Sequence, residues 1–234
     1  TIKVSKFFKF KVRLDFNLYF EMLKEGFIYS LALLILSLIY NSDIIILKLL
    51  DIDVDELGIY ALTSKIVQGL CILPQSIGTI FFSLSTKKDY PANVKSKIII
   101  FKLFLYILIV LLLILYFFMP EIINLVLGSA YDKSFDIFIL LIPGICGLFI
   151  IKTLYPDLAG QGEVKPFIKF FIFISLFHII LNYVLILEYS INGCAIACSI
   201  SYFLLGLFIL KKYLKHYSIK LKQLFILSFN DIRL

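Results

Sequence analysis

The chain has 234 residues, of which 61% are hydrophobic and only 17% are charged, and its formal net charge is +7. Soluble domains are usually about 45–50% apolar and about 25% charged. So few polar side chains cannot cover a water-soluble globule of this size. The composition therefore excludes a soluble protein and predicts an all-α integral membrane protein.

Six apolar segments are long enough to cross a bilayer core, which takes about 20 residues of helix. The second of them contains Pro74 and Gly78 and is expected to kink, because neighbouring helices can satisfy the backbone groups that such a break frees. The spans are expected at 26–50, 58–86, 98–119, 136–155, 167–187 and 193–211.

These spans form one predicted six-helix transmembrane bundle over residues 26–211. Residues 1–25 are basic and partly amphipathic, which predicts a linker segment on the cytoplasmic membrane surface. Residues 212–234 form a basic tail that is expected in the cytoplasm or at the interface, and that could instead lead into a further span.

The cations between the spans are distributed unevenly from one connection to the next. Residues 1–24 carry six Lys and Arg residues, the connection after the second span carries four, the connection after the fourth carries two, and the tail from Lys211 carries six. The intervening connections carry Lys133 alone. Cytoplasmic connections attract Lys and Arg, so both termini are expected in the cytoplasm. This arrangement also explains the positive charge without a nucleic-acid partner.

Asp43 and Lys65 are the charged residues expected deepest in the membrane. They lie eleven residues before and after residue 54, where the first hairpin is expected to turn. At about 1.5 Å per residue this places them at similar depth. An ionisable group inside a membrane usually faces a bundle interior or a water-filled cavity. We therefore predict that Asp43 faces a polar cavity with Lys65 as its partner. The alternative is a static pair that only locks the two helices together.

Other polar residues in the spans divide into two groups. Three lysines near span ends are expected to extend their ammonium groups to a membrane surface: Lys48, Lys102 and Lys152. Four polar side chains are expected beside Asp43 and Lys65: Asn41, Ser42, Ser64 and Gln68.

His178 and Asn182 lie one helical turn apart in the fifth predicted span. A histidine in this setting is more often a hydrogen-bonded contact between helices than a ligand site. Its pKa range also suits proton coupling, which stays open as a second role.

The sequence contains none of the short motifs that indicate a soluble enzyme. No G-x-S-x-G, H-E-x-x-H, Walker-type loop or C-x-x-C pair occurs, so we predict neither an enzyme nor a cofactor. "GQGE" at 160–163 is interpreted as a turn between spans. No metal site is predicted, because the cysteines lie in or at the edge of apolar segments, where we expect them to act as small apolar residues: Cys71, Cys146, Cys194 and Cys198.

Four stretches carry a family resemblance: "LKEGFIYSLALLILSLIYNSDIIIL", "ELGIYALTSKIVQGL", "MPEIINLVLGSAYDKSFDIFILLIPG" and "INGCAIACSIS". In order and spacing over residues 15–212 they resemble the carboxy-terminal half of bacterial polysaccharide-repeat flippases of the O-antigen type. These belong to the multidrug/oligosaccharidyl-lipid/polysaccharide exporter superfamily. Each motif alone is generic.

The resemblance implies one lobe of a two-lobed, alternating-access transporter in the bacterial cytoplasmic membrane. Its substrate would be an undecaprenyl-pyrophosphate-linked oligosaccharide, carried to the outer leaflet for surface polysaccharide assembly. Lys65 would screen the pyrophosphate, and Asp43 would tune it or exchange a coupling ion. The implied partners are the lipid bilayer, a missing amino-terminal lobe or a second copy, and other polysaccharide-assembly proteins. The chain begins with Thr1, which is also expected of a part of a longer protein.

Three alternatives stay open from the sequence. A drug or small-cation exporter of the same superfamily would more often have an acidic, aromatic cavity. A membrane enzyme of polysaccharide assembly could use His178, although the longest outer connection lacks His and Arg. A scaffold without transport activity would leave the deep charges unexplained.

Overall fold

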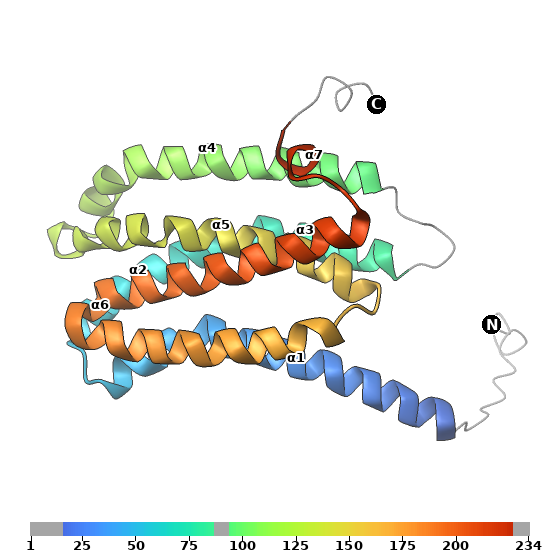
Figure 1. The fold of residues 1–234 in the computed structure, drawn as a ribbon. Coiled ribbons are helices and arrows are strands. Elements are labelled where there is room, and N and C mark those ends of the chain that lie inside the picture. Colours follow the sequence, from blue (N-terminus) through green and yellow to red (C-terminus); the bar gives the residue numbers. More distant parts are fainter. Residues whose placement is uncertain (1–15, 87–93, 227–234) are drawn as a thin grey trace, which may run out of the picture.

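The structure, a computed structural model, describes residues 16–86 and 94–226, and these ranges contain helices and no strand (Figure 1). Its elements are α1 (Phe16–Leu49), α2 (Val54–Leu70), α3 (Ile72–Ser85), α4 (Val94–Val126), the 3-10 turn η2 (Ser129–Tyr131), α5 (Lys133–Gly160), α6 (Lys165–Tyr217) and α7 (Leu221–Phe225). Four of the helices are long and apolar enough to cross a membrane, and the α2–α3 pair is a fifth if the two helices form one span. The prediction of an all-α protein with apolar, membrane-length helices is confirmed.

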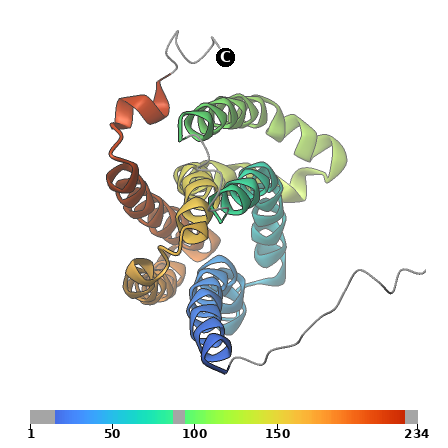
Figure 2. The same ribbon diagram turned by 90° about the vertical axis from the view of Figure 1, so that its right-hand side faces the viewer.

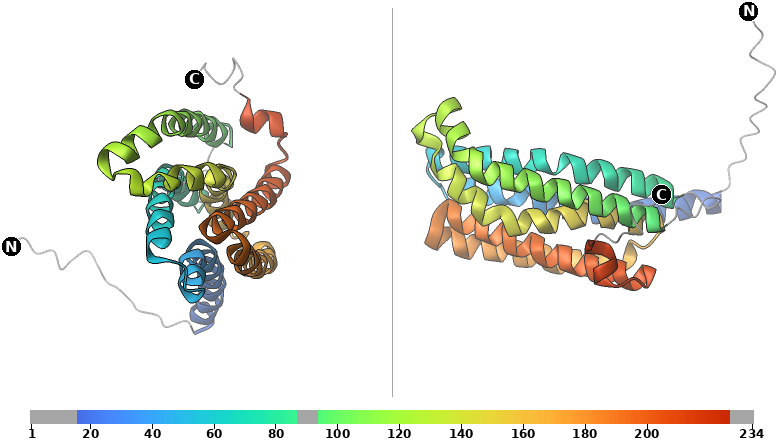
Figure 3. Two further views of the ribbon diagram at one scale, coloured as in Figure 1. Left: turned by 90° about the vertical axis from the view of Figure 1, so that its left-hand side faces the viewer. Right: turned by 90° about the horizontal axis from the view of Figure 1, so that it is seen from above.

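Helix α5 is the centre of the bundle. Views along the helices place it between α4 and α1, with α3 and α6 on its flanks (Figures 2 and 3). In the most apolar 18-residue stretch of this helix 67% of the residues are buried, compared with 28% in the corresponding stretch of α4. The exposed side chains of α4 are mostly Leu, Ile, Val and Phe, as expected for a helix that faces lipid.

The predicted kink in the second span is confirmed. Helices α2 and α3 meet at Cys71 and are bent by 41° relative to one another. Pro74 lies three residues after the break, where it has no N–H to donate and its ring disturbs the preceding turn. The bend therefore follows from the sequence.

Helix α6 reverses direction at Ser190, whose backbone angles (φ 50°, ψ −132°) are not helical. Its two arms run back along one another, as Figure 1 shows. The reversal is tight, because a Cβ atom on Gly193 would overlap the carbonyl oxygen of Leu185 in the other arm. The predicted spans 167–187 and 193–211 fall one on each arm.

Two predicted boundaries differ from those in the structure. A helix was expected from Phe16 as a linker separate from the first span, but α1 begins at Phe16 and runs unbroken into that span, so residues 16–25 continue it and extend past the other helices in Figure 1. Helix α4 continues through an apolar run to Val126 and ends before Gly128, whose φ of +83° suits glycine. The predicted connection 120–136 is therefore mostly helical.

The predicted tail is also partly helical, because α6 continues to Tyr217 before the short α7 begins. The remainder of the predicted linker and tail, residues 1–15 and 227–234, lies outside the described residues, as do Lys87 and Lys88. The turn predicted at "GQGE" is present between α5 and α6, where Gly162 has a φ of +85°.

The connections gather at two opposite ends of the bundle. One end holds the start of α1, the α5–α6 turn and α7, and the other holds the α1–α2 turn, η2 and Ser190 (Figures 1 and 3). The first is the end at which the sequence concentrates its cations, and it is called the basic end below.

Candidate functional site

Asp43 is buried, with 3% of its surface exposed, and among the described residues it is held by hydrogen bonds and not by a cation. The Tyr60 hydroxyl donates to Oδ2 over 2.6 Å, and the backbone N–H of Ile44 donates to Oδ1 over 2.9 Å. The Cys198 thiol lies 3.9 Å from Oδ2. Helices α1, α2 and α6 therefore meet at this carboxyl group.

The predicted Asp43–Lys65 ion pair is wrong: the structure contains no such bridge within the residues it describes. The Lys65 ammonium is exposed on α2 and donates to Gln68 Oε1 over 3.0 Å. Asp53 ends the connection after α1 and caps α2 by accepting from the N–H of Asp55 over 3.3 Å. Because of this cap, α2 begins at Val54 and the hairpin turns earlier than expected. This earlier turn places Tyr60 opposite Asp43.

The cap could have been found in the sequence. Asp53 is followed by Asp55 and Glu56, and acidic residues after an N-cap residue are typical of a helix start. With that start, the turn is centred near residues 51 and 52, midway between Asp43 and Tyr60. The prediction failed because it counted the capping residues as part of the connection.

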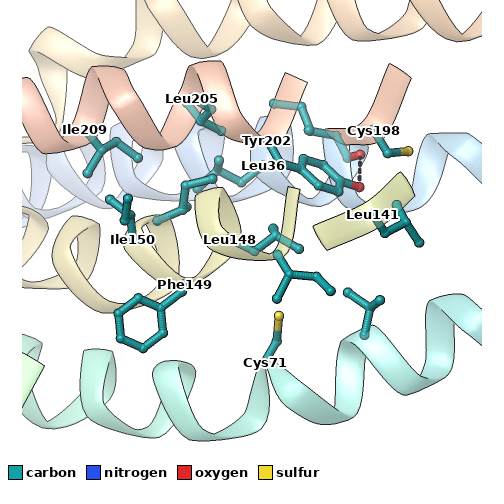
Figure 4. Packing of buried hydrophobic residues seen from close by; sticks show 14 of the residues in the cluster. Leu36, Cys71, Leu141, Leu148, Phe149, Ile150, Cys198, Tyr202, Leu205 and Ile209 are labelled. Carbon is teal, nitrogen blue, oxygen red and sulfur yellow. Dashed lines mark hydrogen bonds between the residues drawn. The ribbon is translucent and has the colours of Figure 1, made fainter. Parts of the chain in front are cut away.

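Asp43 and Tyr60 form the floor of a cavity of about 290 Å³ enclosed by α1, α2, α3, α5 and α6. Its apolar walls include Leu141 and Leu148 of α5, which lie near Cys71 in Figure 4. Four more polar side chains line it toward its open side: Asn41, Ser64, Gln68 and Gln75. The structure thus brings together the predicted residues Asn41, Asp43 and Gln68, with Ser64 beside them. Ser42 is buried but does not line the cavity.

Lys152 is the cation of this cavity. Its ammonium donates to Gln75 Oε1 over 3.3 Å and lies 4.9 Å from the centre of the Tyr40 ring. At such a distance cation–π attraction is significant. The prediction that Lys152 extends to the membrane surface is therefore wrong. Both contacts depend on the α2–α3 bend, which the sequence predicted, and on the rotation of each helix about its axis, which the sequence pattern does not indicate.

His178 and Asn182 are fully buried and do not line the cavity. The Asn182 side-chain amide donates to the His178 carbonyl over 3.0 Å and lies 3.2 Å from Nε2 of the ring. The His178 ring stacks on Tyr202, with 5.8 Å between ring centres, and Tyr202 lines the cavity. The pair is therefore connected to the cavity through the Tyr202 ring. The stacking of His178 on Tyr202 is a contact between the two arms of α6.

A second polar cluster, not found from the sequence, surrounds Asp157 near the basic end. Asp157 is 0% exposed and forms a salt bridge of 2.5 Å with Lys97, which is 4% exposed. The hydroxyls of Tyr213 and Tyr217 donate to Asp157 Oδ2 over 3.0 and 2.9 Å, whereas the Ser85 hydroxyl donates to Oδ1, the oxygen that Lys97 contacts. This Asp157 network joins α3, α4, α5 and α6.

Sequence reasoning missed the network for an identifiable reason. It ended the fourth span at residue 155 and counted Lys97 as a loop cation, whereas α5 continues to Gly160 and α4 begins at Val94. Both residues therefore lie in helices. An acidic residue directly after Pro156, within an apolar run, was the available signal.

Metal ligands do not gather anywhere in the described ranges, where no group of three or more His, Cys, Asp or Glu residues could hold an ion. The described cysteines are free thiols, and Cys71, Cys194 and Cys198 are buried in the core. The chemistry of the cavity is therefore that of one carboxyl group, one ammonium group, amides, phenols, the Ser64 hydroxyl and the thiols of Cys71 and Cys198.

Replacing Tyr60 with phenylalanine is expected to destabilise the fold by about 1–2 kcal/mol, the cost of leaving a buried acceptor without its donor. The acceptor is Asp43 Oδ2, which would lose the Tyr60 hydroxyl. Chemical unfolding of the detergent-solubilised protein would measure this change. Tyr183→Phe is the matched control, since Tyr183 is exposed. An equal effect of both substitutions would show that the Tyr60–Asp43 bond is not formed.

No protein-family model, curated protein or solved structure matches this chain, so a function must be inferred from the cavity itself.

Proposed function

We propose that this chain is one six-span lobe of a two-lobed, alternating-access flippase in the bacterial cytoplasmic membrane, with both termini in the cytoplasm. It moves an undecaprenyl-pyrophosphate-linked oligosaccharide repeat unit from the cytoplasmic to the outer leaflet, for assembly of a surface polysaccharide such as O-antigen or capsule. The sequence resemblance to polysaccharide-repeat flippases suggests the substrate, and one structural observation supports transport.

That observation is a group of exposed polar side chains on α1, α2 and α3, which we call the polar face. It exposes Asn41, Lys65, Gln68 and Gln75 beside the mouth of the cavity, within the middle stretches of α1 and of the α2–α3 pair. Polar groups at membrane depth are costly against lipid and normally face protein or a water-filled cavity. The polar face is therefore one wall of an aqueous pathway, whose other wall is an amino-terminal lobe or a second copy.

The break in α6 supports a count of six spans. A span requires roughly 20 residues of helix. The arms 165–189 and 191–217 are each longer than that, and they run in opposite directions. Together with α1, α2–α3, α4 and α5 they make six crossings. An even number of crossings places the start of α1 and α7 on the same side of the membrane. This agrees with the basic end, which holds both of them.

The cavity has groups suited to a pyrophosphate-linked sugar. The ammonium groups of Lys152, in the cavity, and Lys65, on the polar face, would screen the phosphates during the crossing. The rings of Tyr40 and Tyr202 offer the flat amphipathic surfaces that pack well against sugar rings. Asp43 is bound to Tyr60 at the floor, where it orients the phenol and balances the charge of Lys152. These roles are those of a transporter and not of an enzyme.

Export of a drug or small cation is the second candidate, and the aromatic cavity with its carboxyl group favours it. The positions of the charges favour the flippase. Asp43 is 3% exposed and both of its oxygens already accept hydrogen bonds, whereas Lys152 is only half-buried and lies near the exposed amide of Gln75. An anion reaching the cavity therefore meets Lys152 before Asp43.

Uptake of a radiolabelled short-chain polyprenyl-pyrophosphate disaccharide into proteoliposomes containing the full-length protein tests the proposal. Lys152→Gln is expected to lower the initial rate about tenfold, because a charge-assisted bond to phosphate contributes about 1.5–3 kcal/mol and about 1.4 kcal/mol is a factor of ten. Lys48→Gln is the control, since Lys48 is exposed at the end of α1 away from the cavity. It should leave the rate unchanged.

The flippase proposal would be overturned in favour of a cation exporter by a different pattern of uptake. The protein would take up ethidium and not the disaccharide, and ethidium uptake would be lost in Asp43→Asn but retained in Lys152→Gln. Uptake of neither probe by a correctly folded protein would overturn both.

A further inference from the structure

A second cavity lies at the basic end, between the first turns of α4 and the segment that joins α6 to α7. We call it the α4–α7 groove; its volume is about 690 Å³. Val94, Lys95, Ile98 and Lys102 form its α4 wall, at spacings that place them on one face of the helix. The groove is separate from the cavity at Asp43, with which it shares no lining residue.

The opposite wall of the groove is built by a turn in the chain. Ser218 ends α6 in the left-handed conformation, with a φ of 53°, and the chain then folds back into α7. Phe225 anchors α7 on α4, because its ring packs edge-on against Phe101 at 5.9 Å and its carbonyl accepts from the Tyr106 hydroxyl over 3.2 Å. The wall is therefore held in place, and it contributes Tyr217, Ile219, Lys222, Gln223 and Ile226.

The lining of the groove combines two chemical characters. Three lysines contribute positive charge, while no acidic side chain occurs among the described residues that line the groove. Aliphatic side chains on both walls, Ile98 and Ile219 among them, provide an apolar surface beside these cations. Free phosphate would use only the lysines, whereas a phospholipid would use both the lysines and the apolar surface.

We infer that the α4–α7 groove binds the phosphate headgroup of an anionic membrane phospholipid. Basic pockets between membrane helices on the cytoplasmic side are suited to such headgroups. The groove lies at the basic end, beside the first turns of the apolar helix α4. The phosphate contacts the exposed lysines Lys95 and Lys222, Lys102 adds its charge from the buried α4 wall, and the acyl chains follow the apolar surface of α4 into the bilayer.

The bound lipid is linked to the Asp157 network through Tyr217. This residue lines the groove, and its hydroxyl donates to Asp157 over 2.9 Å. Its ring lies 5.8 Å from the Lys97 ammonium. A lipid that holds Tyr217 and α7 in place therefore stabilises a network that joins four helices, so binding should be visible as increased thermal stability.

The test is the thermal stability of the full-length protein in a neutral detergent as it is titrated with phosphatidylglycerol, phosphatidylcholine or inorganic phosphate. Phosphatidylglycerol is expected to raise the melting temperature, with phosphatidylcholine and inorganic phosphate giving little change at the same concentration. Lys222→Gln and Lys95→Gln should each weaken the apparent affinity for phosphatidylglycerol about fivefold, the effect of one lysine at an anionic membrane surface. Both residues are exposed, so both variants should fold.

Lys169→Gln is the matched control, because Lys169 is an exposed lysine near the same end that does not line the groove. It removes the same charge and should leave the affinity unchanged. Equal weakening in all three variants would overturn the inference by showing a general charge effect. Equal stabilisation by phosphatidylcholine, or by inorganic phosphate, would overturn the assignment to an anionic lipid. None of these results depends on transport, so the inference and the proposed flippase activity can fail independently.

Discussion

Lys97→Met is expected to lower the free energy of unfolding by about 3–5 kcal/mol, the cost of removing one partner of a buried ion pair. Methionine keeps most of the methylene volume, so the loss is one of charge and hydrogen bonding. Asp157, 0% exposed, would then lose its cation and be left with only hydroxyl donors around it: Ser85, Tyr213 and Tyr217. Four helices should loosen together, because each contributes a side chain to this network.

A double variant separates this explanation from a general packing defect. Lys97→Met combined with Asp157→Asn removes both charges, and it should recover part of the stability that Lys97→Met loses, since a neutral side chain is less costly to bury than an unpaired carboxylate. Lys169→Met, at an exposed lysine, should change stability by no more than about 0.5 kcal/mol. Unfolding of the solubilised protein in denaturing detergent measures all three. If the double variant is less stable than Lys97→Met alone, the buried ion pair is not what joins these helices.

Gly147→Ala is expected to destabilise the protein by about 2–3 kcal/mol, in the upper part of the range for overpacked cores. A Cβ atom at Gly147 would overlap the carbonyl group of Tyr202 and lie 2.8 Å from Cα of Phe203. These atoms belong to the backbone of α6, so they cannot rotate away as the end of a side chain would. The two helices would have to separate, which loses the close packing on which helix association in membranes depends.

The same substitution at Gly26 is the matched control. Gly26 lies within α1 and an added Cβ atom would meet no atom within 4 Å. Alanine is the better helix former, so Gly26→Ala should stabilise the protein by up to about 1 kcal/mol. Opposite signs for the two substitutions, measured as shifts in the midpoint of unfolding, would confirm the close α5–α6 contact. A stabilising Gly147→Ala would contradict it.

The sequence by itself determined the class of protein and most of its helices. Its long apolar runs suit a membrane, where only internally hydrogen-bonded structures satisfy the backbone, and these runs do form helices that are long and apolar enough to cross one. Pro74 marked the bend between α2 and α3 because the missing N–H acts locally. Helix ends were predicted less well: α4 ends at Val126 because an apolar helix continues until a glycine stops it, and α1 runs without a break from Phe16 into the first span.

The sequence also indicated part of the cavity. Asp43 has no long side chain with which to reach water, so its presence in an apolar helix predicted a polar site around it, and Asn41 and Gln68 do line that site. Depth along a helix follows from residue count and is therefore accessible from the sequence.

Only the tertiary structure decided which groups meet. The direction in which Lys65 and Lys152 point depends on the rotation of each helix about its axis and on the position of the turn, and a small error in either moves a side chain to another face. Tyr60 replaced Lys65 as the partner of Asp43 because α2 begins earlier than expected. The Lys97–Asp157 pair joins helices that are distant in the sequence, and no local pattern encodes a contact of that kind.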